Sequence, residues 1–252
     1  MPERVNPSCY VIAQTALTDV ESYLISIGSP DWRPDDQVSD SENLIEFAGR
    51  ICYRSWEPHN ESKPDATNPN VVKVRKGNAP YIGHVLSVGH GSILEHASIT
   101  FVAKDVSRIF THEQVRHRAG FAYSQESLRF VRLTQLRYYL PECFAKDPWA
   151  AKYFHDKFEE MERWQQELTD HFSAELGPDA PFNRKKELTS AFRRLAPEGL
   201  ATSIVFTANL RALRHVIRMR TSPGAEEEIR VFYDEVARMV KESFPNVFQD
   251  ME

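Results

Sequence analysis

Apolar side chains recur at helical intervals along several parts of the 252-residue chain. The longest such pattern runs from Ala150 to Leu176, where large apolar residues follow one another at spacings of three, four and seven. Asn209 is a residue type that caps helices, and a helical pattern begins at the next position. The same periodicity predicts further helices after Ser41 toward Cys52 and over Tyr81–Val88, Val106–Arg118, Glu187–Leu195, Leu210–Met219 and Ala225–Ser243.

Three short segments carry the β-branched and aromatic residues that are typical of strands, namely Cys9–Ala13, Ala97–Val102 and Thr202–Thr207. Polar, proline-bearing stretches at Pro30–Ser41 and Trp56–Asn78 separate these elements and are expected to be loops. A loop as long as the second one is usually functional or disordered. Long helices and few strands predict an α+β fold, with a single domain over residues 1–252.

Composition excludes several classes of protein. A net charge of −5 argues against a basic nucleic-acid-binding protein, so an anion site has to come from local clusters of arginine. The three cysteines are far apart, which argues against a disulfide framework or a zinc ribbon. No apolar run is long enough to span a membrane and no signal-peptide core is visible, so we expect a cytoplasmic protein without membrane contact.

Two familiar cofactor motifs are not supported. His112-Glu113 and His117 resemble the HExxH zinc motif, but a spacing of five places the two rings about 140° apart around a helix. We therefore predict no metal site. The ten glycines form neither GxGxxG nor GxxxxGK[ST], so a bound dinucleotide has to be held by side chains.

Arginines gather in three places, and guanidinium groups pair well with phosphate and carboxylate. In the first cluster they alternate with Phe121, Tyr123, Gln125 and Ser127, as a nucleotide pocket requires. Each arginine could also lie on a solvated helix face. The clusters are Arg116, Arg118, Arg129 and Arg132; Arg193 and Arg194; and Arg211, Arg214, Arg218 and Arg220.

The segment Arg116-His117-Arg118, followed by Tyr123 to Phe130, resembles the signature of the flavin-dependent thymidylate synthases. That signature is Arg-His-Arg, seven residues and then Ser, usually followed two places later by Arg-Tyr. The stretch His90–His96 is similar to the family's upstream segment, and the stretches Arg193–Pro197 and Asn209–Arg220 are similar to its downstream ones. The matching blocks span about residues 85–230 in the family's order.

The resemblance implies transfer of a methylene group from methylenetetrahydrofolate to uracil C5, with FAD carrying hydride from NADPH. It also implies a homotetramer with shared active sites, built on a small mixed sheet with long helices, and no cysteine nucleophile. Arg220 is the implied catalytic residue, next to the uracil edge. The implied FAD site comprises His90, Ser92, Glu95, Arg116, His117, Arg118, Gln125, Asn209, Arg211 and His215. The implied nucleotide site comprises Glu113, Gln114, Arg116, Gln125, Glu126, Ser127, Leu128, Arg129, Arg193 and Arg220.

Several departures from the pattern leave the acceptor open. Eight residues rather than seven separate Arg118 from Ser127, so one residue is extra within positions 119–122. Phe130 replaces the usual Tyr, Glu113 stands where Gln is common, and His215 replaces an Asn of some members. We expect dUMP as acceptor, with a UMP-methylating relative as the alternative, because the extra residue could widen the loop near the ribose. A third alternative is an RNA-binding or RNA-modifying protein that uses the Arg211–Arg220 face.

Overall fold

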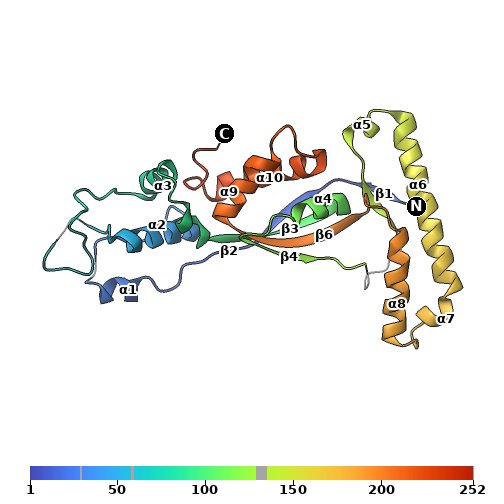
Figure 1. The fold of residues 1–252 in the computed structure, drawn as a ribbon, viewed down its shortest axis with the longest axis horizontal. Coiled ribbons are helices and arrows are strands. Elements are labelled where there is room, and N and C mark those ends of the chain that lie inside the picture. Colours follow the sequence, from blue (N-terminus) through green and yellow to red (C-terminus); the bar gives the residue numbers. More distant parts are fainter. Residues whose placement is uncertain (29, 58–59, 129–134, 252) are drawn as a thin grey trace.

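The structure is a computed structural model that describes residues 1–28, 30–57, 60–128 and 135–251. A four-stranded sheet lies at its centre and a helical arm extends from one end (Figure 1). The elements are β1 (Glu3–Val5), β2 (Ser8–Gln14), α1 (Glu21–Ser26), α2 (Asp40–Tyr53), α3 (Asn78–Ser87), the 3₁₀ helix η1 (Gly91–Glu95), β3 (Ser98–Ser107), α4 (Arg108–Gln114), β4 (Phe121–Gln125), β5 (Arg137–Tyr139), α5 (Glu142–Ala145), α6 (Pro148–His171), α7 (Ser173–Leu176), α8 (Phe182–Phe192), the 3₁₀ helix η2 (Arg193–Leu195), β6 (Ala201–Asn209), α9 (Leu210–Arg220) and α10 (Glu227–Ser243).

The central sheet has the order β2-β3-β6-β4, and all its neighbouring strands are antiparallel. The parallel pairing that the expected mixed sheet requires occurs in a separate sheet of two short strands, β1 and β5. Residues alternate along β3 and β6, so Phe101 and Phe206 stack in the core while Thr100 and Thr207 share a hydrogen bond on the opposite face. Helices α4, α9 and α10 cover the core face (Figure 1).

Helix α9 has the two faces that its sequence predicts. Leu210, Leu213 and Ile217 are buried in the main core, whereas Arg211 and Arg218 are exposed. Asn209 caps the helix as predicted, because its side-chain oxygen accepts a hydrogen bond from the Ala212 amide at 2.8 Å. The helix therefore starts directly at the end of β6 and presents its basic face next to that end.

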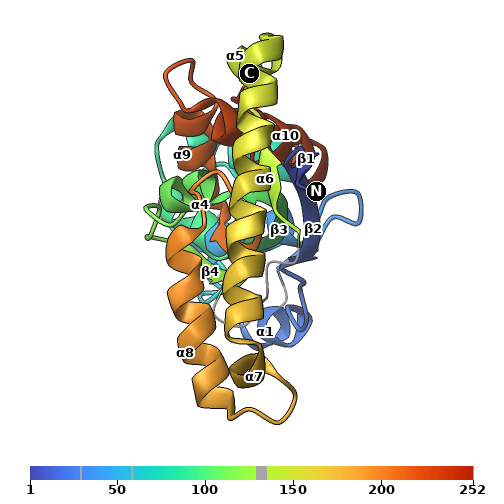
Figure 2. The ribbon, with the colours of Figure 1, turned by 90° about the vertical axis from the view of Figure 1, so that its right-hand side faces the viewer.

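The arm consists of α6, α7 and α8, and α6 crosses in front of the sheet in the end-on view (Figure 2). Leu128, Tyr138 and Phe158 contribute to one small core at its base, and a second small core joins α8 to the end of α6. Among the described helices, none is both long enough and apolar enough to cross a membrane.

Most of the predicted elements are present, with shifted limits. Helix α2 begins two residues earlier than predicted, because Ser39 and Glu42 form a reciprocal capping box. The helix predicted over Val106–Arg118 is wrong at both ends. Val106 and Ser107 complete β3, Ser107 caps α4, and the helix ends at Gln114. The predicted helix Ala150–Leu176 is interrupted at Phe172, between α6 and α7.

Candidate active site

The Arg-His-Arg segment lies in a turn between α4 and β4, next to the start of α9. Strand β4 pairs with β6 so that Phe121 faces Ala208, one residue before Asn209. The Asn209 amide donates to the Gly120 carbonyl at 2.9 Å, which ties the turn to the helix cap. Two distant blocks of the sequence pattern are thereby brought together.

These segments enclose a pocket of about 560 Å³. Phe121 and Val216 contribute apolar surface, and Glu95 is its one acidic lining residue, among those that the structure describes. Arg211 pairs with Glu95 across the pocket edge. The pocket collects seven of the residues predicted to bind FAD, namely Glu95, Arg116, His117, Arg118, Asn209, Arg211 and His215.

Gly120 makes the turn possible and was missed by the sequence reasoning. Its φ of +76° is a conformation that residues with a Cβ rarely adopt. A Cβ at this position would lie 2.5 Å from the Asn209 side-chain nitrogen and 2.8 Å from the Ala212 Cβ. The glycine between the signature arginines and an aromatic strand was the available signal for a tight turn against another element.

Arg220, at the end of α9, contacts the signature directly. Its Nε donates to His117 Nε2 at 2.9 Å, and its NH1 forms an ion pair with Glu113. The Arg220 side chain is only 14% exposed. The predicted catalytic arginine, the signature histidine and the unusual glutamate therefore form one cluster beside the pocket.

The protonation state of His117 follows from this cluster. Burial, reinforced by the charges of Arg220, His215 and Arg116, lowers the pKa of His117 to about 4. The ring is therefore neutral near pH 7. Because Nε2 accepts the hydrogen bond from Arg220, the single ring proton lies on Nδ1.

Two tyrosines brace the turn from the protein interior. The Tyr123 hydroxyl lies 2.8 Å from the Gln114 carbonyl and 2.6 Å from the His117 carbonyl, the two acceptors open to its proton. The Tyr233 hydroxyl, on α10, donates to the Gln114 side-chain oxygen at 2.8 Å. Gln114, predicted to bind the nucleotide, is fully buried and faces α10. Its side chain therefore supports the turn from inside the core.

The arginines of α9 differ in what they contact. Arg214 is almost fully buried and pairs through NH2 with both carboxylate oxygens of Asp250 at 2.7 Å. Arg218 contacts the same carboxylate at 3.0 Å. These two arginines hold the C-terminal segment, whereas Arg211 and Arg220 lie at the pocket.

The residues predicted to hold the nucleotide lie mainly at the other end of β4. Gln125 faces Ile204 in the sheet, and its side chain donates to the Thr111 hydroxyl at 3.2 Å. Glu126 and Ser127 follow, and Leu128 is buried at the base of the arm. Arg193 is exposed on η2. Arg129, Phe130 and Arg132 lie outside the described residues.

The segment that holds the extra residue of the signature, positions 119–122, forms the turn and the start of β4. Ala119 and Gly120 form the turn, and both line the pocket with Phe121. Four residues of strand separate Gly120 from Gln125, a distance of about 17 Å. Within one protomer, the insertion therefore adjoins the predicted FAD residues rather than the nucleotide loop.

The remaining predicted residues lie next to the pocket. Ser92 is exposed on η1, and His90 lies just before that helix, where its ring stacks on Tyr53 at 5.7 Å. His112 forms a 3.2 Å contact with Glu198, whereas His117 faces Arg220. In the described part of the chain, no group of three or more His, Cys, Asp or Glu side chains is arranged to hold a metal ion.

The family described as "Thymidylate synthase complementing protein" matches residues 36–246. Proteins named flavin-dependent thymidylate synthase are similar over most of their length. The one from Corynebacterium diphtheriae is 35% identical, covering 96% of this chain and 92% of its own. The one from Corynebacterium glutamicum is 35% identical, covering 100% of this chain and 92% of its own. The one from Mycolicibacterium gilvum is 39% identical, covering 83% of this chain and 79% of its own. The chain therefore belongs to the flavin-dependent thymidylate synthase family.

Proposed function

We propose that this protein methylates uracil C5 of dUMP, with FAD as cofactor, methylenetetrahydrofolate as carbon donor and NADPH as reductant. Its family makes it an enzyme of the methyltransferase type that uses a flavin. The observation that carries the finer proposal is the hydrogen bond between His117 and Arg220. It joins the signature to the helix that bears the catalytic candidate, at the edge of a cationic pocket.

The pocket chemistry fits a dinucleotide. Arg116, Arg118 and Arg211 supply guanidinium groups for a diphosphate, and the rings of Phe121 and His215 offer surfaces for a base. Asn209, Ser92 and Glu95 would complete this part, with His90 at its margin. A volume of about 560 Å³ lies within the range of cofactor sites. The bound flavin would supply the hydride that reduces the transferred methylene to a methyl group.

Arg220 would activate the nucleotide. Uracil C5 becomes a good nucleophile as negative charge develops over N3 and its carbonyl oxygens, and a fixed guanidinium stabilises that charge. Glu113 and His117 hold the Arg220 guanidinium at all three of its nitrogens, since NH2 also donates to the Glu113 carbonyl at 3.3 Å. The neutral His117 ring orients Arg220 without adding a repelling positive charge. Glu113 would also be within reach of a sugar hydroxyl once a nucleotide is bound.

The nucleotide loop supports the expectation of shared active sites. Gln125, Glu126, Ser127, Leu128, Arg129 and Arg193 are the expected phosphate and base contacts. In this protomer Gln125 to Leu128 lie at and beyond the far end of β4, about 17 Å from Gly120, and Arg193 lies on η2. A second copy of the chain that places its loop at the turn would complete the site, in keeping with the homotetramer that the resemblance implies.

Purified protein tests the proposal. We expect a yellow protein, or one that becomes yellow with FAD, that converts dUMP to dTMP when given NADPH and methylenetetrahydrofolate. Parallel assays with UMP measure the acceptor preference, and we expect dUMP to be preferred. Protein that cannot be loaded with FAD, or loaded protein that methylates neither nucleotide, would contradict the proposal. Light scattering of the purified protein separately measures how many chains assemble.

A further inference from the structure

The long loop between α2 and α3 forms the wall of a second pocket, of about 400 Å³. Residues 70–75 line one side of it, and Tyr53, Tyr81 and His84 line others. The sequence marked this loop as too long to be a simple connection. In the structure it encloses space beside the predicted flavin site.

The pocket is strongly cationic. Lys73, Arg75, His84 and His90 line it, and no Asp or Glu side chain does so among the residues that the structure describes. Lys73 and Arg75 form no ion pair with any residue that the structure describes. Burial, together with the nearby charges of Arg75 and His90, lowers the pKa of His84. These four basic side chains thus line one pocket, and an anion between them would offset the positive charges of Lys73 and Arg75.

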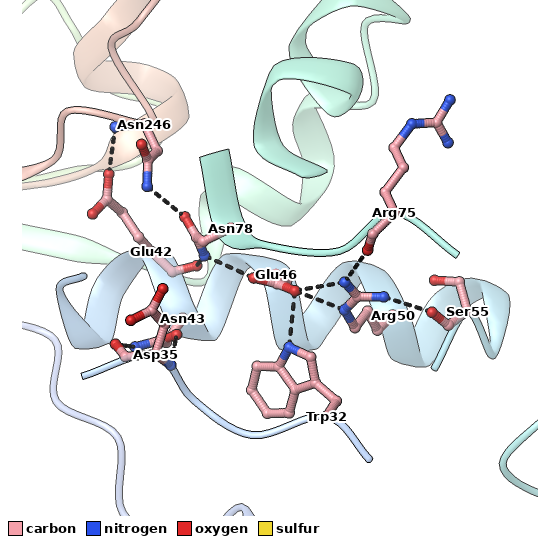
Figure 3. A network of polar contacts seen from close by, with 10 residues as sticks. All are labelled: Trp32, Asp35, Glu42, Asn43, Glu46, Arg50, Ser55, Arg75, Asn78 and Asn246. Carbon is pink, nitrogen blue, oxygen red and sulfur yellow. Dashed lines mark hydrogen bonds and ion pairs between the residues drawn. The ribbon is translucent and has the colours of Figure 1, made fainter. Parts of the chain in front are cut away.

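A buried network fixes the wall of this pocket (Figure 3). The Arg50 guanidinium donates to the Ser55 carbonyl at 2.6 Å and to the Arg75 carbonyl at 2.7 Å. Glu46 accepts from Arg50 Nε at 2.8 Å and balances its charge. Figure 3 shows the Arg75 side chain directed away from this network. The backbone of Arg75 is thus held in place, and its guanidinium forms no ion pair with the described residues.

The pocket adjoins the predicted flavin site. His90 lines this pocket, Glu95 lines the other, and only the four residues Gly91 to Leu94 lie between them. The five steps from His90 to Glu95 span about 10 Å in a 3₁₀ helix. A Cβ at Gly91 would lie 3.3 Å from Arg211 Nε, so η1 also packs closely against α9. A molecule in the second pocket would therefore reach toward the cofactor.

We propose that this second pocket binds the anionic end of a co-substrate, a phosphate or carboxylate group carried on a planar organic molecule. Lys73 and Arg75 would pair with the anion, and the stacked rings of Tyr53 and His90 would contact the planar part. The identity of the co-substrate rests on the proposed function, which offers two: the 2′-phosphate of NADPH and the glutamate carboxylates of the folate.

Anion binding is measurable without turnover. In the FAD-loaded enzyme, with its flavin pocket filled, we expect inorganic pyrophosphate to shift the His84 ring signals in NMR spectra. The Lys73→Ala/Arg75→Ala variant is expected to weaken pyrophosphate binding at least about tenfold. Lys76→Ala is the matched control, because Lys76 is exposed on the same loop but does not line the pocket. Lys73→Ala alone keeps the Arg75 side chain and provides a milder variant.

Steady-state kinetics then separate the two sources. A KM increase for NADPH, with the KM for NADH unchanged, assigns the pocket to the 2′-phosphate. A KM increase for methylenetetrahydrofolate alone assigns it to the carboxylates. His84 signals that do not respond to pyrophosphate, or that respond equally in the double variant, would overturn the proposal. Because the NMR result needs no methylation, it decides this proposal even if the proposed reaction is wrong.

Discussion

The two ends of strand β4 differ in how complete they are within one chain. At the Phe121 end, the turn, η1 and α9 of one chain line a pocket. At the Gln125 end, the nucleotide loop leaves the sheet toward the base of the arm, away from Arg220. A signature that is continuous in sequence therefore contributes to two places, because an extended strand runs through its middle.

Replacing Arg220 by alanine tests whether the turn end carries the chemistry. We expect the rate of methyl transfer at saturating nucleotide to fall about 100- to 1000-fold, because a fixed guanidinium no longer stabilises charge on the uracil. FAD absorbance of the purified variant is expected to persist, since Arg220 contacts the pocket only through His117.

Arg218→Ala is the matched control on the same helix, because Arg218 faces Asp250. We expect its turnover to remain close to that of the unaltered enzyme. Near-normal turnover of the Arg220→Ala variant, measured with FAD bound, would remove Arg220 from the catalytic role.

Glu228 does not line the pocket, so a change at this residue tests the fold at the other, loop end. It is buried, and its carboxylate accepts from the Ser107 amide at 2.6 Å and from the Ser107 hydroxyl, at the start of α4. Burial, only partly offset by these hydrogen bonds, raises the pKa of Glu228 to about 7. The folded state thus favours the protonated carboxyl.

The raised pKa of Glu228 sets the direction in which stability changes with pH. The contribution of Glu228 is fully present below its ordinary pKa of 4.5 and is lost as the pH rises through about 7, at a cost of up to about 3 kcal/mol. Chemical denaturation between pH 4.5 and 8 measures it. Glu228→Gln is expected to flatten this decline. An unchanged pH profile in the glutamine variant would contradict the assignment.

His117, at the turn end, has a lowered pKa and therefore acts in the opposite direction, with stability lost as the pH falls from 6.5 toward 4.

Gly120→Ala tests whether the extra residue belongs to the flavin end. The new Cβ would meet Asn209 and Ala212, and the positive φ adds strain, so we expect a loss of about 2 kcal/mol in stability. FAD affinity is expected to fall, measured by fluorescence as FAD is titrated into the apoprotein.

The ratio of dUMP to UMP turnover, measured at saturating FAD, is expected to stay constant in the same variant. A changed ratio of dUMP to UMP turnover with normal FAD affinity would show that the extra residue affects the nucleotide site instead.

Sequence reasoning identified the elements whose periodicity is long and unbroken, such as α6, β6 and α9. It missed β4, because Phe121–Gln125 is short and its aromatic and polar residues equally suit a binding loop. In the site, the pattern grouped Arg211, Arg214, Arg218 and Arg220 together. Their separate roles depend on Glu95, Asp250 and Glu113, carboxylates that only the folded chain brings beside them. Such distant pairings leave no periodic signal.

The smallest expected effect concerns the brace behind the turn. Tyr123→Phe removes the hydroxyl that faces the Gln114 and His117 carbonyls and leaves the ring in place. We expect a loss of about 1 kcal/mol in stability. If the hydroxyl positions the Arg-His-Arg turn, FAD affinity falls about fivefold as well, whereas the KM for dUMP stays constant. Tyr10→Phe, on the exposed face of β2, is the control for the loss of a hydroxyl. A Tyr123→Phe variant that loses stability but binds FAD normally would show that the turn holds its shape without the brace, because Gly120 and Asn209 suffice.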